Sequence, residues 1–274
     1  MKKNLALVAA SMVAVALVGC GAAQEPEVVE QPEVVEQPEV VEEPEVVEEP
    51  EVVEDEVKAM SYAEFMAAEI GAPVVIEAYV VDYQSWWADA VTVYLADEDG
   101  AYFVYKMACT EDQFIDDLNL GSKIRVTGAK AEYAGEIEIG ADDMGNAPTF
   151  EVVDADAFFV PDVVDVTEFV GTDDLANYMN QYVAFNEMEV KEVSFKESDD
   201  DKDIYVTLAK GENEIGFCLE YYLNGYCDED FWNQVAELKA GDVVNVEAYL
   251  YWYNGANPHL VYVEMAADDA AVED

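Results

Sequence analysis

Apolar and polar residues alternate along two separate parts of this chain, residues 60–160 and 161–267, each with the length of a small domain. A period of two is typical of strands that bury one face. In residues 60–160 the alternation breaks at clusters of Gly, Asp and Asn, which divide it into short runs rich in Val, Ile and Tyr. The pattern predicts strands at Val74–Tyr83, Ala90–Ala96, Ala101–Ala108, Lys123–Tyr133 and Gly135–Ile139, with Phe150–Val153 extending the last hairpin.

Two helices and one tight turn complete this first part. Ser61 with Glu64 three residues later forms a capping-box signature, and Gly71 follows the end, so a short helix is predicted over Ser61–Ile70. The run from Asp97 to Gly100 predicts a hairpin turn, because Asp-Gly readily adopts the positive φ that such turns need. A second helix is predicted over Glu111–Leu118.

The second part repeats this succession of signals. Its pattern predicts strands and one helix in the same order, with the helix at Glu229–Leu238. The strands are expected at Tyr182–Val193, Asp203–Leu208, Glu214–Leu223, Asp242–Tyr251 and His259–Met265.

The order of three strands, a helix and two strands resembles the OB-fold, a small Greek-key barrel. The run Leu118–Val126 parallels Leu238–Val246, and both look like the Leu-x-x-Gly segment that enters the fourth strand of bacterial OB-fold domains. The resemblance implies a mainly β protein with short helices, built from two consecutive OB-fold-like barrels at 60–160 and 161–267, similar to modules of bacterial surface lipoproteins. Two unrelated small β-domains or one larger sandwich remain the alternatives.

A basic and then apolar leader opens the chain. Lys2 and Lys3 precede an apolar run from Leu5 to Val18, which is too short to span a bilayer but typical of a signal peptide. Leu17-Val18-Gly19-Cys20 resembles the lipobox of bacterial lipoproteins. The resemblance implies that residues 1–19 are removed and that Cys20 carries the lipid. The alternative is an ordinary secretory signal, cleaved a few residues after Cys20.

Residues 20–59 are predicted to be a disordered tether between that anchor and the first barrel. A six-residue repeat of Pro-Glu-Val-Val-Glu places prolines at 26, 32, 38, 44 and 50, which prevents a long helix. Residues 25–57 contain fourteen Glu, one Asp and no basic residue, so charge repulsion extends the chain. At a rise of about 3.1 Å per residue, this segment reaches roughly 100 Å. Residues 268–274 are expected to be a disordered acidic tail.

The acidity of the chain narrows the range of partners. The formal net charge is −50, and residues 58–274 hold 47 of the 62 acidic residues and 10 of the 12 basic ones. Polyanion binding depends on clustered Lys and Arg, so nucleic acid is disfavoured as a partner despite the fold. A saline habitat or simple solubility would explain the charge. Suitable partners are wall carbohydrates, peptides and basic proteins, besides the membrane that the lipid on Cys20 enters.

The side chains needed for catalysis are scarce. His259 is the single histidine, and it stands next to Pro258 at the start of a predicted strand, where a structural or solvated role is expected. Arg125 is the single arginine and is predicted to lie inside a strand, which argues against a nuclease. We therefore expect a protein that is not an enzyme and has no cofactor.

Two further sets of residues are candidates for ion or thiol sites. Asp199, Asp201 and Asp203 have the alternate spacing of calcium ligands, but Ile204 stands where such a loop needs Gly, so a solvated acidic loop with weak cation binding is expected. Cys109, Cys218 and Cys227 are expected to be reduced thiols, with a bridge between the last two left open.

Aromatic side chains in the predicted loops are the best candidates for ligand contacts. In OB-folds the loops after the first and fourth strands flank the groove that takes oligonucleotides and oligosaccharides. Aromatic rings in such loops stack on bases or sugar rings. The alternative is that these rings close the barrel ends or join the two domains. The candidates are Tyr83, Trp86, Trp87 and Tyr133 in the first barrel, and Tyr251, Trp252 and Tyr253 in the second.

These features together predict a membrane-anchored extracytoplasmic lipoprotein that displays two OB-fold-like binding modules on an acidic spacer. Carbohydrate, peptide or protein is the expected ligand. A nucleic-acid-binding protein and an accessory subunit of a cell-surface enzyme are the alternatives.

Overall fold

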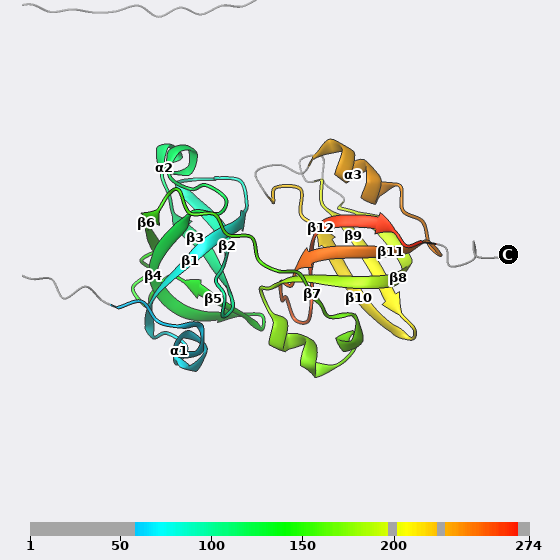
Figure 1. Ribbon diagram of the computed structural model, residues 1–274, viewed down its shortest axis with the longest axis horizontal. Coiled ribbons are helices and arrows are strands. Elements are labelled where there is room, and N and C mark those ends of the chain that lie inside the picture. Colours follow the sequence, from blue (N-terminus) through cyan, green and yellow to red (C-terminus); the bar gives the residue numbers. More distant parts are fainter. Residues whose placement is uncertain (1–57, 197–201, 224–227, 268–274) are drawn as a thin grey trace, which may run out of the picture. The chain divides into compact units, whose positions relative to one another are not determined.

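The computed structural model describes residues 58–196, 202–223 and 228–267 of the chain (Figure 1). The predicted leader with Cys20, most of the tether and the acidic tail lie outside the described residues, as do Asp199, Asp201 and Cys227. In the described part, no helix has the length and hydropathy needed to cross a membrane.

The first barrel is a closed sheet of five strands. β1 (Pro73–Tyr83) pairs antiparallel with β2 (Ala90–Ala96) on one side and with β4 (Lys123–Tyr133) on the other. β3 (Ala101–Ala108) follows β2 and pairs in parallel with β5 (Glu136–Gly140), which returns to β4. The resulting order, β1-β2-β3-β5-β4 and back to β1, leaves no free edge within the barrel.

The second barrel repeats this order. β8 (Tyr182–Phe195) pairs with β9 (Ile204–Lys210) and, on its other side, with β11 (Val243–Tyr249). β10 (Asn213–Leu219) pairs in parallel with β12 (His259–Met265), and β12 returns to β11. Both barrels therefore have the OB-fold arrangement, with a parallel pairing between the third and fifth strands.

A short helix follows the third strand in each barrel, as the sequence predicted. α2 (Glu111–Asp116) begins after Thr110, whose hydroxyl accepts the Gln113 amide in a capping box. α3 (Glu229–Ala236) begins after Asp228, whose carboxylate accepts amides of the first turn. Both caps satisfy backbone donors that a helix start otherwise leaves without partners.

Other elements lie outside the two barrels. α1 (Tyr62–Ala67) has the predicted capping box at its start, but it ends before Ile70 because Ala68 is already extended. β6 (Thr149–Asp154) adds an edge strand to β4. The sequence pattern did not predict three short elements before the second barrel, because their segment shows neither alternation nor a helical period. They are β7 (Val164–Asp165), the 3₁₀ helix η1 (Thr167–Phe169) and the 3₁₀ helix η2 (Asp173–Tyr178).

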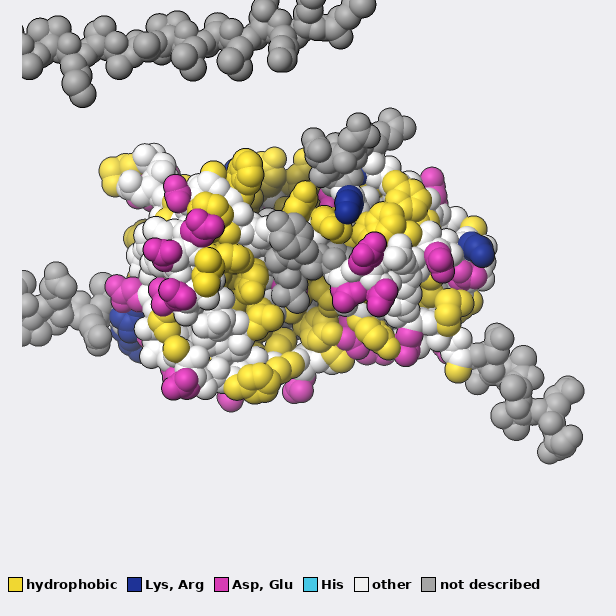
Figure 2. Space-filling model, turned by 90° about the horizontal axis from the view of Figure 1, so that it is seen from above, with side chains coloured by type: hydrophobic (Ala, Val, Ile, Leu, Met, Phe, Trp, Pro, Cys, Tyr) yellow, Lys and Arg dark blue, Asp and Glu magenta, His cyan; other side chains and the backbone are white. Residues whose placement is uncertain are grey.

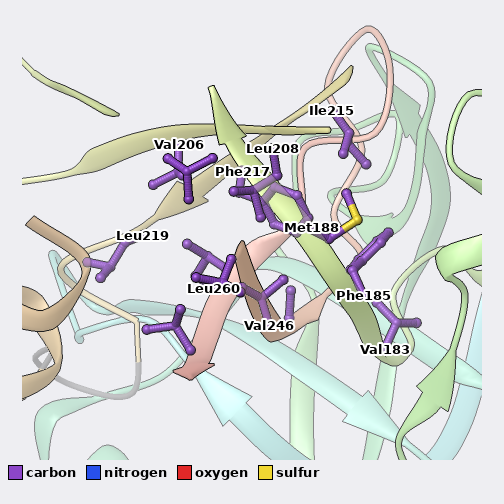
Figure 3. Packing of buried hydrophobic residues seen from close by; sticks show 14 of the residues in the cluster. Val183, Phe185, Met188, Val206, Leu208, Ile215, Phe217, Leu219, Val246 and Leu260 are labelled. Atoms are coloured by element: carbon purple, nitrogen blue, oxygen red, sulfur yellow. The ribbon is translucent and has the colours of Figure 1, made fainter. Parts of the chain in front are cut away.

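Each barrel encloses its own apolar core, formed by the inward-facing half of the alternating residues. In β9 and β10 the inward positions carry Val206, Leu208, Ile215 and Phe217, all buried. Figure 3 shows these side chains meeting others from β8, β11 and β12 inside the second barrel. The outward-facing half of the same strands is therefore available for contacts with ligand or with other parts of the chain.

Candidate ligand-binding site

The outer face of β1, β2 and β3 in the first barrel is covered by the second barrel. Tyr94 and Phe103 point outward from β2 and β3, yet they are buried in a cluster with Leu223 and Tyr249. Tyr94 stacks on Tyr249 with ring centroids 4.7 Å apart, and the Tyr249 hydroxyl donates to the backbone oxygen of Val81 at 3.0 Å. This is the face around which OB-folds take ligands, so its central strands are occupied within the chain itself.

The predicted aromatic residues of the first barrel divide between the core and the surface. Tyr83 packs edge-on against Phe114, and the Trp86 indole donates to the Cys109 carbonyl at 2.7 Å, so both rings help to close the barrel. Trp87, in contrast, is 80% exposed. Tyr133 is 59% exposed and lies at the tip of the β4–β5 hairpin.

In the second barrel the three predicted rings have different surroundings. Tyr251 packs against Phe103 of the first barrel, with ring centroids 5.2 Å apart, and so joins the two barrels. Tyr253 is 49% exposed and lies 6.1 Å from Tyr133, centroid to centroid. Trp252 is partly buried and lines a cavity of about 460 Å³.

That cavity adjoins the outer surface of the second barrel. Trp252 comes from the β11–β12 loop and Gly216 from β10, where a Cβ atom would meet nothing within 4 Å. Glu214, Asp173 and Thr172, which carry polar side chains, are among the other residues that line it. An indole beside an uncovered strand with polar groups at its rim has the composition of a small-molecule or sugar subsite.

The Trp252 loop rests on the tip of the β4–β5 hairpin of the first barrel. The Trp252 amide donates to Glu136 Oε2 at 2.8 Å, and the Asn254 amide donates to the Ala134 carbonyl at 2.7 Å. Gly135 has a φ of +90°, and a Cβ there would lie 2.9 Å from Trp252 Cδ1. Glycine at this position therefore adopts the positive φ that the turn requires, and its lack of a side chain leaves room for the indole.

Two carboxyl groups are buried beside this contact. Glu136 is 0% exposed and Glu138 is 7% exposed, and both point outward from β5 into the interface between the barrels. Burial raises the pKa of Glu136 to about 8 and that of Glu138 to about 7. Because a carboxylate loses its hydration in such a place, the neutral acid is favoured for Glu136 near neutral pH.

The single histidine has a structural position in this interface. His259 Nδ1 lies 3.0 Å from the Tyr94 hydroxyl and 3.3 Å from Glu220 Oε2. Burial lowers the pKa of His259 to about 4, so the ring is neutral near pH 7 and the contact with Glu220 is not an ion pair there. Gln84 donates its amide to both oxygens of Glu220, which ties the loop after β1 to the second barrel.

The described part of the predicted calcium loop is engaged within the protein. Asp203 is buried, accepts the Tyr221 amide at 3.0 Å and lies 3.3 Å from the Lys196 ammonium. Its partners Asp199 and Asp201 lie outside the described residues. Among the residues that the structure describes, no three His, Cys, Asp or Glu side chains are grouped to hold a metal ion.

The cysteines that are described are both buried. Cys109 is a thiol whose pKa burial raises to about 11, so it stays protonated. Cys218 lies on β10, as predicted, and its suggested partner Cys227 is outside the described residues.

The sequence pattern did not identify the buried polar side chains at the contact between the barrels, of which Glu136 accepts the Trp252 amide. In the sequence pattern, Glu136 and Glu138 occupy outward-facing strand positions and Asn180 lies in a loop. All three side chains are buried in the structure. A strand pattern does not show which outward-facing residues a second domain covers. Gly216 was also missed. An isolated glycine inside a strand is the one signal that was available, since it often marks a close approach to a ligand or to another backbone.

Comparisons with known proteins give only distant structural likenesses. No family model and no curated protein matches the chain. Among solved structures, it is similar to the Ifi202 HINa domain in complex with a 20-base-pair double-stranded DNA, at 11% identity over 72% of this chain and 98% of that chain, with a TM-score of 0.32.

It is also similar to a single-stranded DNA binding protein from Thermus aquaticus, at 12% identity over 74% of this chain and 97% of that chain, with a TM-score of 0.27. For asparaginyl-tRNA synthetase from Pyrococcus horikoshii, the match at 14% identity covers 35% of this chain and only 21% of the synthetase, with a TM-score of 0.27. The strand order of the two barrels, rather than these distant likenesses, defines the chain as a tandem OB-fold-like β protein.

Proposed function

We propose that this protein is an extracytoplasmic, lipid-anchored binding protein without catalytic activity, and that its second barrel binds a neutral oligosaccharide. The observation that carries the ligand class is Trp252, whose indole lines a cavity beside the uncovered surface at Gly216. A sugar ring stacks on an indole through its apolar face, while its hydroxyls need acceptors such as Glu214 and Asp173 at the rim.

The distribution of charge favours a neutral ligand over a nucleic acid. Acidic side chains are spread over the face shown in Figure 2, with few basic ones among them. Three cations of the first barrel are engaged internally: Lys123 and Arg125 pair with Glu77 at 3.1 and 2.7 Å, and Lys130 donates to the backbone carbonyl of Met66. Phosphate binding would require such groups to face the ligand.

The oligosaccharide proposal predicts that Trp252→Ala weakens retention of the protein in affinity electrophoresis through gels containing neutral polysaccharides such as dextran and glucomannan. Stacking of a base on one aromatic ring contributes about 1–3 kcal/mol, and a similar contribution from a sugar ring means that the affinity should fall roughly 5- to 150-fold. Trp252→Phe should keep part of the retention because a ring remains.

Trp87→Ala is the matched control, since Trp87 is 80% exposed and belongs to the first barrel. The proposal fails if wild-type protein is not retained by any of the gels, or if the Trp252 and Trp87 variants behave alike. If the wild-type protein binds single-stranded DNA at low salt, the alternative that it is a nucleic-acid-binding protein would be favoured instead.

The anchoring proposal rests on the leader and on Leu17–Cys20 alone. Two acyl chains on Cys20 would hold the protein stably at a bilayer, whereas one chain gives only marginal binding. We expect mass spectrometry of protein extracted from bacterial membranes to find Cys20 as the first residue, with a diacylglyceryl group on its sulfur. An unmodified N-terminus after Ala22 or Ala23 would show that the protein is secreted without an anchor.

A further inference from the structure

The last strand of the first sheet, β6, has an open edge. It pairs antiparallel with β4 on one side, and within the described part of the chain no strand pairs with it on the other (Figure 1). Apart from the pairing with β4, residues 149–154 make no backbone–backbone hydrogen bond in that part. An edge of this kind directs a row of N–H and C=O groups outward, where another extended strand can pair with them.

The side chains of β6 are exposed as well as its edge. Phe150 is buried in the core of the first barrel, but the four residues that follow it are all exposed. Val152 and Val153 are 38% and 46% exposed, and they lie between the exposed acids Glu151 and Asp154. Two β-branched residues favour pairing with a further strand, while the charges beside them limit which strand can pair.

The strand that already pairs with β6 shows which chemistry complements it. In the register of the two strands, Lys123 of β4 stands opposite Asp154. Arg125 stands opposite Glu151, and an isoleucine of β4 stands opposite a valine of β6 between these two positions. Opposite charges and apolar pairs across neighbouring strands stabilise a sheet, whereas like charges directly opposite each other destabilise it. A strand complementary to β6 therefore carries basic residues on either side of apolar ones.

The acid-Val-Val-acid pattern of β6 recurs in the chain, and it forms an edge strand at a second described position. Residues 162–165 read Asp-Val-Val-Asp, and the last two form β7, which pairs with β8 at the edge of the second sheet. β7 is the poorer site for a partner, because it has two residues and its Asp165 carboxylate already accepts hydrogen bonds from Thr167 and Asn186. The tether repeats carry the same pattern, as Glu-Val-Val-Glu, outside the described residues.

We infer that the open edge of β6 binds an extended segment of a partner protein in which two apolar residues lie between two basic ones. The segment adds to the sheet antiparallel, as β4 does on the other side, and places a Lys or Arg opposite each of Glu151 and Asp154. The excess of acidic residues in 58–274, 47 against 10 basic ones, attracts such a partner. A second copy of β6 or a tether repeat would place acids opposite acids, which disfavours both as occupants.

A short synthetic peptide, acetyl-Ser-Lys-Val-Ile-Arg-Ser-amide, serves as the probe for this edge. Titrating it into the full-length protein labelled with nitrogen-15, and following the backbone amides by NMR, measures the position and the affinity of binding together. We expect the largest changes in chemical shift at residues 149–154, because the outward N–H groups of β6 gain hydrogen-bond partners there.

Glu151→Gln combined with Asp154→Asn removes both charges of β6 and keeps the shapes of the side chains. Because two opposite-charge pairs across the strands are lost, the dissociation constant of the peptide should rise roughly 2- to 30-fold. Glu98→Gln combined with Asp99→Asn is the matched control, since it removes the same charges from the exposed turn between β2 and β3 of the same barrel. The amide spectra of both variants also show whether β6 remains paired with β4.

Two altered peptides separate strand addition from simple attraction between charges. Replacing the valine of the peptide by proline keeps both cations but removes a backbone donor from the ladder. The loss of one such hydrogen bond should weaken binding about fivefold. Replacing Lys and Arg by Glu places acids opposite the acids of β6 and should abolish binding.

Four outcomes would overturn the inference. The peptide perturbs no amide of residues 149–154, the β6 variant and the control variant bind it equally, or the proline peptide binds as tightly as the original. Changes confined to residues 26–54 would assign the peptide to the tether repeats and reject β6 as its site. The experiment involves neither Trp252 nor a saccharide, so its result is independent of the oligosaccharide proposal.

Discussion

Tyr94→Ala is expected to lower the free energy of unfolding by about 3–5 kcal/mol, the range found when a large buried aromatic side chain is removed. Tyr94 is 0% exposed although it points away from the core of its own barrel. The change removes its stack on Tyr249 and leaves His259 Nδ1 without the hydroxyl. Denaturant unfolding followed by circular dichroism measures the loss.

Tyr94→Phe separates the two contributions. It keeps the ring and removes only the hydroxyl, so we expect a loss of about 1–3 kcal/mol, typical of a buried polar group left without its partner. Tyr105→Ala is the surface control, because Tyr105 is on β3 but 43% exposed. If Tyr94→Ala costs no more than Tyr105→Ala, the contact between the barrels does not contribute to stability.

The barrel strands could be predicted from the alternation of residues because each buries one face. Ala90–Ala96, Ala101–Ala108, Lys123–Tyr133 and His259–Met265 have the bounds that the pattern predicted. Turn residues predicted the hairpins and capping residues predicted where the helices begin, but the helices end earlier than predicted, at Ala67, Asp116 and Ala236. The predicted strand Glu214–Leu223 is wrong beyond Leu219, where the chain leaves the sheet and contributes Leu223 to the interface instead.

The candidate site was predicted only in part. The prediction that aromatic loop residues contact a ligand included Trp252, which lines a cavity. It also included Tyr251 in the same loop, which instead packs against the first barrel. Alternation separates the two faces of a strand, and it does not distinguish an outward face that meets water from one that meets another domain. Tyr94, Phe103 and Glu136 are all outward-facing residues that the second barrel covers.

The two barrels differ in which part of their outer surface is buried at the interface between them. The first barrel contributes the outer face of β2 and β3 to the interface, whereas the second contributes Tyr249 of β11 and partly buried residues of β8 and β12. The surface of β10 at Gly216 is thereby left open beside Trp252. Two barrels with one strand order therefore differ in which outer surface is covered, and under the proposed function the first supports the Trp252 loop while the second presents the surface for the ligand.

Phe185→Ala should separate the stability of the second barrel from binding at its surface. Phe185 is 0% exposed and meets Phe217 edge-on, with ring centroids 5.0 Å apart, in the middle of the second core (Figure 3). The cavity left behind should lower the free energy of unfolding by about 3–5 kcal/mol, measured by denaturant unfolding.

Phe195→Ala, on the same strand but 50% exposed, should cost about 1 kcal/mol or less. Because Phe185 is not among the residues that line the Trp252 cavity, retention on neutral polysaccharides should be unchanged under conditions where the variant remains folded. Loss of retention in the folded Phe185 variant would mean that the ligand surface depends on the packing of the second core and not on Trp252 alone.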